Sequence, residues 1–351
     1  MRGRRTQSER KATVISQFFC KQTTRRELLR TGGALAGGSL LFGLLPRDLA
    51  AQSAQSSAPQ STQQQTAGLA DRINQMRSQA AAATLHTTKL TDNLYMISGA
   101  GGNMVALDGP DGKVLVDTSF STVATKLKQS LEAISAAPLK LAINTHWHFD
   151  HTDGNEAIHG GGAMILAHEN TRLRMSNTQH MAALGIDFPP SPAAALPQQT
   201  FADAFRLYLN GEDLSLSYFP PAHTDTDIYI HYAKGNVLHM GDIWFNGTFP
   251  LIDESTKGNI NGMITAANRG IALADANTKI VPGHGPLGDR AALSKYRDML
   301  VTVHDRVQAL KSSGKSLDEV VAAKPTADLN DQWGKGFING DVFAGFVYRT
   351  L

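Results

Sequence analysis

The chain of 351 residues contains one short segment that is dense in metal-binding side chains. His146, His148, Asp150 and His151 occur within six residues, directly after the apolar run Leu139–Asn144. Neutral imidazole offers a lone pair near pH 7 and is the commonest metal ligand in proteins. In an extended backbone, side chains two residues apart share a face, so His146 and His148 can reach one ion. A lone His-x-His pair would be weak evidence, but the complete cluster after a strand predicts a metal site.

Three further candidate ligands each follow another apolar run that predicts a strand. They are His223, Asp242 and His284. Singly, each is more often a turn residue or a hydrogen-bonded polar group. Together they place a full set of ligands at strand ends, where functional loops gather. Gly241 and Gly283, which precede Asp242 and His284, allow unusual backbone angles and close approach of the chain.

The predicted ligands, five imidazoles and two carboxylates without a thiolate, suit zinc best and iron or manganese next. The only cysteine, Cys20, lies far from them in sequence. Two ions about 3.5–4 Å apart can share a hydroxide, and zinc-bound water loses its proton near pH 7. One ion can then polarise a scissile carbonyl while the other stabilises the leaving group. Asp150 is the predicted catalytic residue, because it can orient the hydroxide or carry its proton.

The same residues, in the same order, resemble the metallo-β-lactamase superfamily over roughly residues 87–305. The motifs that carry the resemblance are H-x-H-x-D-H, a later His, a Gly-Asp and a Gly-His-Gly. The resemblance implies an α/β fold, the four-layer αβ/βα sandwich of that family, with a two-metal site at one edge. It also implies two ligand sets: His146, His148 and His223 for the first metal, Asp150, His151 and His284 for the second, and Asp242 bridging both. Asp117 matches a family position that supports a ligand histidine from behind.

The function that the resemblance implies is a zinc-dependent hydrolase, in which a metal-bridging hydroxide attacks a carbonyl ester, lactone or amide. Asp242 excludes the β-lactamases that use a thiolate ligand, and the all-histidine β-lactamases lack this carboxylate. Its negative charge should lower the electrophilicity of both metals, so we expect weak β-lactam hydrolysis. Two alternatives stay open: a non-hydrolytic iron redox enzyme, and an accessory periplasmic metalloprotein linked to quinoprotein dehydrogenases.

Other side chains close to the ligands in sequence could contact a substrate. Four aromatic residues could form an apolar wall or pack beneath the site: Trp147, Trp244, Phe245 and Phe249. Three residues could belong to a lid: Met175, His180 and Met181. Lys257 and Arg269 could anchor an anionic substrate, although solvated surface charges are the commoner outcome. His159 is expected to lie outside the site.

The elements that must position these residues alternate between strands and helices. Apolar runs separated by turn residues predict strands at 94–98, 104–108, 113–116, 139–144, 163–167, 214–219, 228–232, 236–240 and 279–281. Helices are predicted at 120–135 and, from apolar residues three and four apart, at 290–311. The Pro-rich segment 186–200 is expected to be an irregular loop. Two sets of strands interleaved with helices predict helices that cover a pair of sheets.

Charge is distributed unevenly along the chain. The first 50 residues carry ten Lys and Arg against three Asp and Glu, and the rest carry 23 against 28. The mildly acidic body argues against a nucleic-acid partner. Arg25 and Arg26 precede the apolar stretch 31–45 and the small residues Ala50 and Ala51, an order typical of an export signal that resembles the twin-arginine type. A buried or membrane-anchoring helix is the alternative.

The predicted organisation has three parts. Residues 1–51 form the twin-arginine-like export signal, residues 52–68 a flexible linker, and residues 69–351 a metallo-β-lactamase-fold hydrolase domain with a C-terminal helical extension. Export would make the protein periplasmic or secreted. The expected partners are the twin-arginine translocation machinery and a small-molecule substrate. The chain has no run of 18 apolar residues, so a multi-span membrane protein is excluded.

Overall fold

The structure is a computed structural model that describes residues 73–181 and 185–351. The predicted export signal (1–51) and linker (52–68) lie outside these residues, as does the start of the predicted domain at residue 69. Within the described ranges, no helix is both long and apolar enough to cross a membrane.

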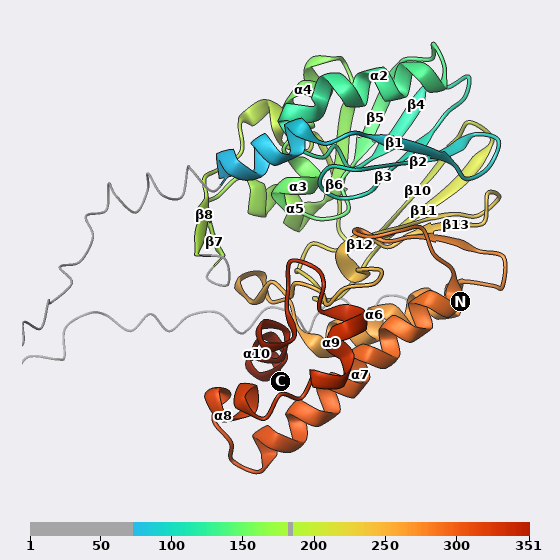
Figure 1. Cartoon of the computed structure of the whole chain (residues 1–351). Helices are drawn as coiled ribbons and strands as arrows, with labels where there is room; N and C mark the ends of the chain where they lie inside the picture. Colours follow the sequence, from blue (N-terminus) through green and yellow to red (C-terminus); the bar gives the residue numbers. More distant parts are fainter. Residues whose placement is uncertain (1–72, 182–184) are drawn as a thin grey trace, which may run out of the picture. The chain divides into compact units, whose positions relative to one another are not determined.

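The first sheet has seven strands in the order β1-β2-β3-β4-β5-β6-β9 (Figure 1). Their bounds are β1 (His86–Lys89), β2 (Leu94–Ser98), β3 (Met104–Leu107), β4 (Lys113–Val116), β5 (Leu139–Ile143), β6 (Met164–His168) and β9 (Gln199–Phe201). Strands β1 to β4 pair antiparallel, whereas β4, β5, β6 and β9 run parallel. Strand β3 is buried along its whole length, as an unbroken apolar run predicts for a strand covered on both faces.

The second sheet has five strands in the order β10-β11-β12-β13-β14. Their bounds are β10 (Ala204–Leu209), β11 (Glu212–Tyr218), β12 (Ile228–Tyr232), β13 (Val237–His239) and β14 (Lys279–Val281). Only the pair β13–β14 is parallel. The carboxyl ends of β13 and β14 therefore lie side by side at one edge, as those of β4 and β5 do in the first sheet.

Apolar side chains from the facing sides of the two sheets form a shared core. Leu94, Val116 and Ile143 of the first sheet belong to the same buried cluster as Leu216 and Ile230 of the second. Burying apolar area of this kind is the main favourable term in folding. The core thereby fixes the two sheets against each other.

Helices cover the outer face of each sheet (Figure 1). Helix α2 (Ala124–Ile134) buries Leu127 and Leu131 against the first sheet. Helices α6 (Ile260–Leu273) and α7 (Arg290–Ser312) cover the second sheet. The order helix, sheet, sheet, helix confirms the predicted four-layer αβ/βα sandwich.

Shorter elements connect these layers. They are a helix over residues 73–82, η1 (Ser121–Val123), α3 (Phe149–Thr152), α4 (Asn155–Gly160), α5 (Glu169–Met175), β7 (Gln179–Met181), β8 (Ile186–Phe188), η2 (Ala193–Ala195), η3 (Gly241–Ile243) and η4 (Glu254–Thr256). After α7 the chain forms α8 (Leu317–Ala322), η5 (Ala327–Leu329), α9 (Asn330–Trp333) and α10 (Gly340–Thr350). These last helices occupy the part of the sequence in which a helical extension was predicted.

The expectation of one irregular loop over residues 186–200 was wrong at both ends of the segment. This segment begins with β8, which pairs with β7, and ends in β9, which pairs with β6. Strand β9 has only three residues, and its hydrogen-bond partners come from a strand more than thirty residues earlier. The prolines lie between the two strands, in residues 189–198, so the irregular stretch is shorter than expected and tertiary pairing decides its ends.

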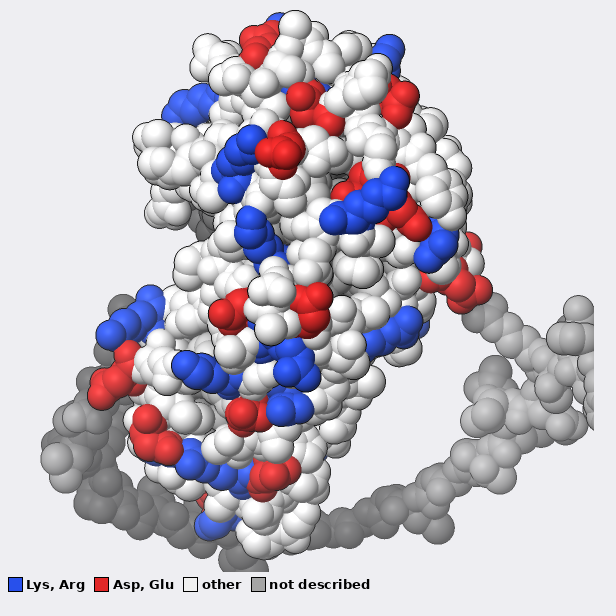
Figure 2. All heavy atoms as spheres, turned by 90° about the vertical axis from the view of Figure 1, so that its right-hand side faces the viewer, with Lys and Arg blue, Asp and Glu red and all other residues white. Residues whose placement is uncertain are grey.

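Figure 2 shows one face of the molecule, on which Lys and Arg are interspersed with Asp and Glu. Among the described residues on that face, neither sign forms a continuous area. Mixed charge does not create a single-sign field that would attract a polyanion. The absence of a nucleic-acid partner stays a prediction.

Phe343 in α10 is fully buried and stacks on Phe249, with ring centroids 5.0 Å apart. We expect Phe343→Ala to lower the free energy of unfolding by about 3–5 kcal/mol, because it removes an aromatic ring from a packed core. Val342→Ala is the matched control, because Val342 is 42% exposed on the same helix. Denaturant unfolding measures both, and equal losses would contradict the packing of α10.

Candidate metal centre

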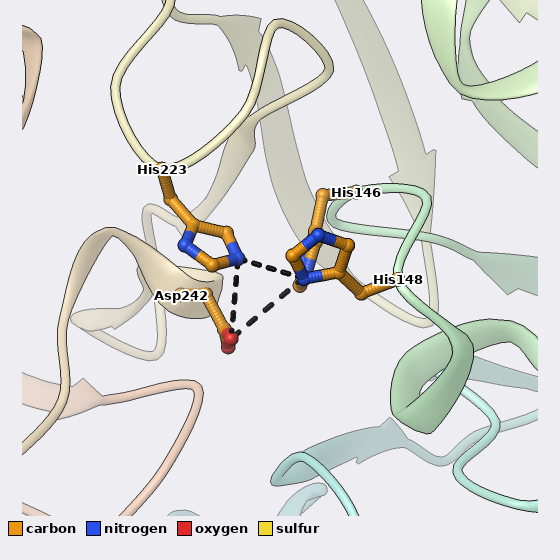
Figure 3. A group of neighbouring side chains, drawn as sticks. All are labelled: His146, His148, His223 and Asp242. Atoms are coloured by element: carbon orange, nitrogen blue, oxygen red, sulfur yellow. Dashed lines mark hydrogen bonds and ion pairs between the residues drawn. The ribbon is translucent and has the colours of Figure 1, made fainter. Parts of the chain in front are cut away.

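All seven predicted ligands converge at the edge where strands of both sheets end. Strand β5 delivers His146, His148, Asp150 and His151, the loop between β11 and β12 carries His223, and Asp242 and His284 follow β13 and β14. Figure 3 shows His146, His148, His223 and Asp242 pointing toward one another; His146 and His148 share one loop, whereas His223 and Asp242 come from two other segments. Hydrogen bonds between the loops reinforce this placement: the Ile228 N–H donates to the Thr145 carbonyl at 2.9 Å.

The ligands form two groups. His146, His148, His223 and Asp242 make the first group, and Asp150, His151 and His284 make the second; within each group the ligand atoms lie within 4.8 Å of one another. These are the two sets that the family resemblance implies, except that Asp242, expected to bridge them, is grouped with the first. The structure thus brings together every residue that the sequence proposed as a ligand.

Asp242 lies between the two groups. Its Oδ2 is 3.5 Å from His223 Nε2 and 3.8 Å from His146 Nε2 in the first group. Its Oδ1 is 3.1 Å from His151 Nε2, and its Oδ2 is 3.3 Å from His284 Nε2, in the second group. A carboxylate in this position can contact two cations at once.

Four of the five imidazoles are oriented by a hydrogen bond at the nitrogen that faces away from the centre. The partners are Thr145 Oγ1 for His146 (3.0 Å), Asp253 for His148 (3.1 Å), Asp117 for His151 (2.7 Å) and the Leu251 carbonyl for His223 (2.9 Å). Carboxylates and carbonyls only accept, and the Thr145 hydroxyl donates its own proton to Asp117. Each ring must therefore donate at its outer nitrogen, and a neutral ring then keeps a lone pair on the nitrogen that faces the centre.

These lone pairs explain why the residues fit a metal. His148 Nδ1 and His223 Nε2 are 2.9 Å apart, and two acceptors at this distance repel each other unless a cation or a proton lies nearby. His146 Nε2 is buried and has no hydrogen-bond partner among the described residues. Buried polar atoms are normally satisfied, so such an orphan calls for an explanation. The donor set and its orphan atom both fit bound metal ions.

The electrostatic environment favours cations. Burial lowers the pKa of His146 well below its usual value and that of His223 to about 4, so both rings are neutral ligands at pH 7. Burial also lowers the pKa of His284, but Asp242 and Asp150 outweigh it and raise that pKa to about 10. Burial opposes the ionisation of Asp150, yet the neighbouring histidines hold its pKa at about 2. The ionised carboxylates therefore give the centre a negative potential, which attracts cations.

Asp117 occupies the supporting position that the sequence suggested. Its side chain is fully buried, and it accepts from the Thr145 N–H and hydroxyl, each at 2.8 Å, as well as from His151. Its backbone has φ of 61°, in the left-handed region that a non-glycine residue seldom adopts. Strain of this kind persists where surrounding contacts hold it and is typical of functional sites.

Asp253 contacts the candidate ligand His148 and was not expected from the sequence. It is buried and accepts from His148 and from the Ser255 and Thr256 hydroxyls. Burial opposes its ionisation, but these contacts lower the pKa of Asp253 below its usual value. The local sequence Asp-Glu-Ser-Thr indicates only the cap of a short helix, and nothing in it points to a histidine 105 residues away.

The aromatic residues near the ligands have different roles. The Phe245 ring stacks on His284, with centroids 5.1 Å apart, so it forms an apolar wall of the site. Trp244 and Phe249 are buried in the core behind the second sheet. Trp147 packs edge-on against His148 and belongs to a separate apolar cluster. Trp147, Phe149 and Phe188 also line a cavity of about 200 Å³ beside the ligand segment.

Of the three predicted lid residues, two are buried and one is exposed. Met175 and Met181 are buried in the cluster around Trp147. His180 is exposed on the β7–β8 hairpin and pairs with Asp187. None of the three is among the grouped ligands.

The structure also places His159, Arg269 and Lys257. His159 lies outside the ligand groups, where its Nδ1 contacts the Ala163 carbonyl at 3.0 Å. Arg269 lies over the rings of Phe219 and Tyr229, which makes it part of the packing behind the second sheet. The Lys257 side chain is 73% exposed, and its Nζ lies 3.6 Å from Oδ2 of Asp225, which is outside the ligand groups. Substrate anchoring by Lys257 stays a prediction.

A family profile described as the metallo-β-lactamase superfamily matches residues 98–315. The chain belongs to this superfamily. The match covers more than half of its 351 residues and spans both ligand groups.

Named relatives share part of this sequence. The chain is 25% identical over 211 residues to the acyl-coenzyme A thioesterase MBLAC2 of Bos taurus, which covers 55% of this chain and 72% of that protein. It is 28% identical over 187 residues to the probable metallo-hydrolase MJ0888 of Methanocaldococcus jannaschii, which covers 52% of this chain and 86% of that protein. The superfamily and these relatives identify the chain as a metal-dependent hydrolase.

A solved structure shows the same fold. The sec-alkylsulfatase Pisa1 from Pseudomonas sp. superimposes with a TM-score of 0.57 at 17% identity, over 78% of this chain and 52% of that one. At this identity the likeness supports the fold and says nothing about the substrate.

Gly102 lies directly against the ring of the candidate ligand His151. A Cβ built at Gly102 would lie 2.0 Å from that ring. We expect Gly102→Ala to displace that ring and to lower the metal content per chain. Gly160→Ala is the control, because a Cβ at Gly160 meets no atom within 4 Å. Elemental analysis of metal-loaded protein measures both, and equal metal content in the two variants would contradict the close approach.

Asp253→Asn removes the charge behind His148 and should weaken metal binding by about 10–100-fold, as the loss of an outer partner of a ligand typically does. The matched control is Asp92→Asn, because the Asp92 side chain is fully exposed between β1 and β2 and does not belong to either ligand group. Competition with a chromogenic chelator gives the affinities. An unchanged affinity for the Asp253 variant would show that this carboxylate does not support the centre.

Proposed function

We propose that this protein is a dinuclear zinc hydrolase that cleaves a carbonyl ester, including thioesters and lactones, or an amide. One observation carries the proposal: five imidazole nitrogens and two carboxylates face one another, with Asp242 between the two groups. This donor set, which has no thiolate, suits zinc best, with iron or manganese as the next choices. The thioesterase relatives act on a carbonyl of this class, which supports an acyl substrate.

The ligand groups would each hold one ion. His146, His148 and His223 would bind the first, Asp150, His151 and His284 the second, and Asp242 would contact both. When bound, zinc supplies Lewis acidity at neutral pH. The chain supplies the fixed positions of the ligands, because the outer nitrogens of four rings are already hydrogen-bonded.

Asp150 is the carboxylate best placed for proton transfer. Its side chain is 21% exposed, whereas that of Asp242 is 3% exposed. With its pKa held at about 2, Asp150 is ionised at pH 7 and can accept a hydrogen bond or a proton from water beside the substrate. We therefore assign the catalytic role to Asp150 and a purely binding role to Asp242.

The substrate would approach from the side of Asp150 and His284. The His284 side chain is 29% exposed, while those of His146, His151 and His223 are at most 1% exposed. Phe245 stacks on His284 and gives this entrance an apolar wall. A carbonyl substrate with an apolar acyl group fits such an entrance better than a highly charged one.

His146→Ala should abolish turnover by the zinc-loaded protein, because it removes a ligand from the first group. His159→Ala is the matched control, because His159 lies outside both groups. This variant should retain full activity. A panel of an aryl ester, a lactone, an acyl thioester and the β-lactam nitrocefin reports activity, with β-lactam turnover expected to be the weakest. Equal losses in the two variants would contradict the ligand assignment.

Metal analysis of the same preparation tests the zinc pair. About two zinc ions per chain support the proposal, whereas one iron per chain would favour the redox alternative. Asp242→Ala should lower both metal content and rate, because Asp242 contacts both groups. Unchanged metal content and rate in that variant would remove its proposed bridging role.

A further inference from the structure

His284 differs from the other ligand histidines in how it is held. The other four rings are fixed by hydrogen bonds at their outer nitrogens. Among the described residues, His284 Nδ1 has no hydrogen-bond partner; the ring stacks on Phe245, packs edge-on against His151, and faces Asp150 and Asp242 through Nε2. With no partner at its outer nitrogen, His284 relies more than the other ligands on the backbone of its loop, residues 282–285.

Asn103, in the loop between β2 and β3, holds that loop. Its Nδ2 donates to the Pro282 carbonyl at 3.0 Å and to the Gly285 carbonyl at 2.9 Å, so it binds on both sides of His284. Its backbone N–H donates to the Gly283 carbonyl at 2.7 Å. Asn103 is 5% exposed, so water cannot replace these bonds.

The chemistry of asparagine suits this position. Its amide group has two N–H donors in one plane, and both are used on the two carbonyls. The backbone carbonyl of Asn103 accepts from His239 Nε2 at 3.0 Å, which fixes the residue from its other side. An aspartate here would present an acceptor to two carbonyls and repel them.

We propose that Asn103 is a positioning residue that fixes His284 and so sets the affinity of the second ligand group for its metal. The three histidines of the first group do not depend on it, because they lie on other loops and are held by their own outer hydrogen bonds. This inference rests on the proposed dinuclear centre. It concerns only how one of the two ions is retained.

The test is Asn103→Asp, with Asn103→Ser as a milder variant that keeps one donor. Cobalt(II) titration monitored by absorption, together with chelator competition, gives an affinity for each of the two sites. We expect Asn103→Asp to weaken the second site by about 10–100-fold, with a smaller loss for Asn103→Ser, while the first site keeps its affinity. A His284→Ala variant should lose the second site, and adding Asn103→Asp to it should cause no further loss.

Asn210→Asp is the matched control. Asn210 is also a buried asparagine that joins the two sheets, because its Nδ2 donates to the Gly112 carbonyl at 2.7 Å. It lies in the β10–β11 turn, beside the β3–β4 turn at the opposite end of the strands from the ligands. We expect this variant to lose stability without a change in either metal affinity.

The outcomes separate the two proposals. Wild-type protein that binds fewer than two ions would overturn the proposed dinuclear function. Wild-type protein that binds two, with an Asn103→Asp variant that binds both equally well, would overturn the role of Asn103. Parallel losses at both sites, or the same losses in Asn103→Asp and Asn210→Asp, would also overturn it, because they would reflect general destabilisation.

Discussion

The central constraint on this structure is that the fold must hold mutually repelling ligand atoms close together. Imidazole lone pairs and the carboxylates of Asp150 and Asp242 converge in a largely buried volume, where solvent screens them poorly. Such a cluster is unfavourable by itself, and a bound cation turns the repulsion into attraction. The remaining features of the site can be understood as means of keeping these atoms in place.

The hydrogen bonds that orient the histidine rings come from residues that follow strands of both sheets. Asp117 follows β4 and holds His151, while Asp253 and the Leu251 carbonyl, in the segment after β13, hold His148 and His223. The core between the sheets therefore does more than stabilise the fold. It fixes the distance between the two sets of loops and so the geometry of the centre.

The ligands could be predicted because metal binding demands particular residue types at strand ends, and the apolar runs before them mark those strands. Strands β2, β4, β12 and β14 have the predicted bounds. Strands β9 and β10 were missed for a physical reason. Strand β10 alternates half-buried and exposed residues at the edge of its sheet, and β9 is a three-residue strand whose pairing is supplied by β6.

By itself the sequence determined the donor chemistry, the order of the ligands and the sandwich fold. Only the tertiary structure decided which nitrogen of each ring faces the centre, and which residues hold the rings and loops. Asp253 meets His148 across 105 residues, and Asn103 meets Gly285 across 182. Residue type and spacing act over a few positions, whereas contacts of such separation exist only after the two sheets have packed together.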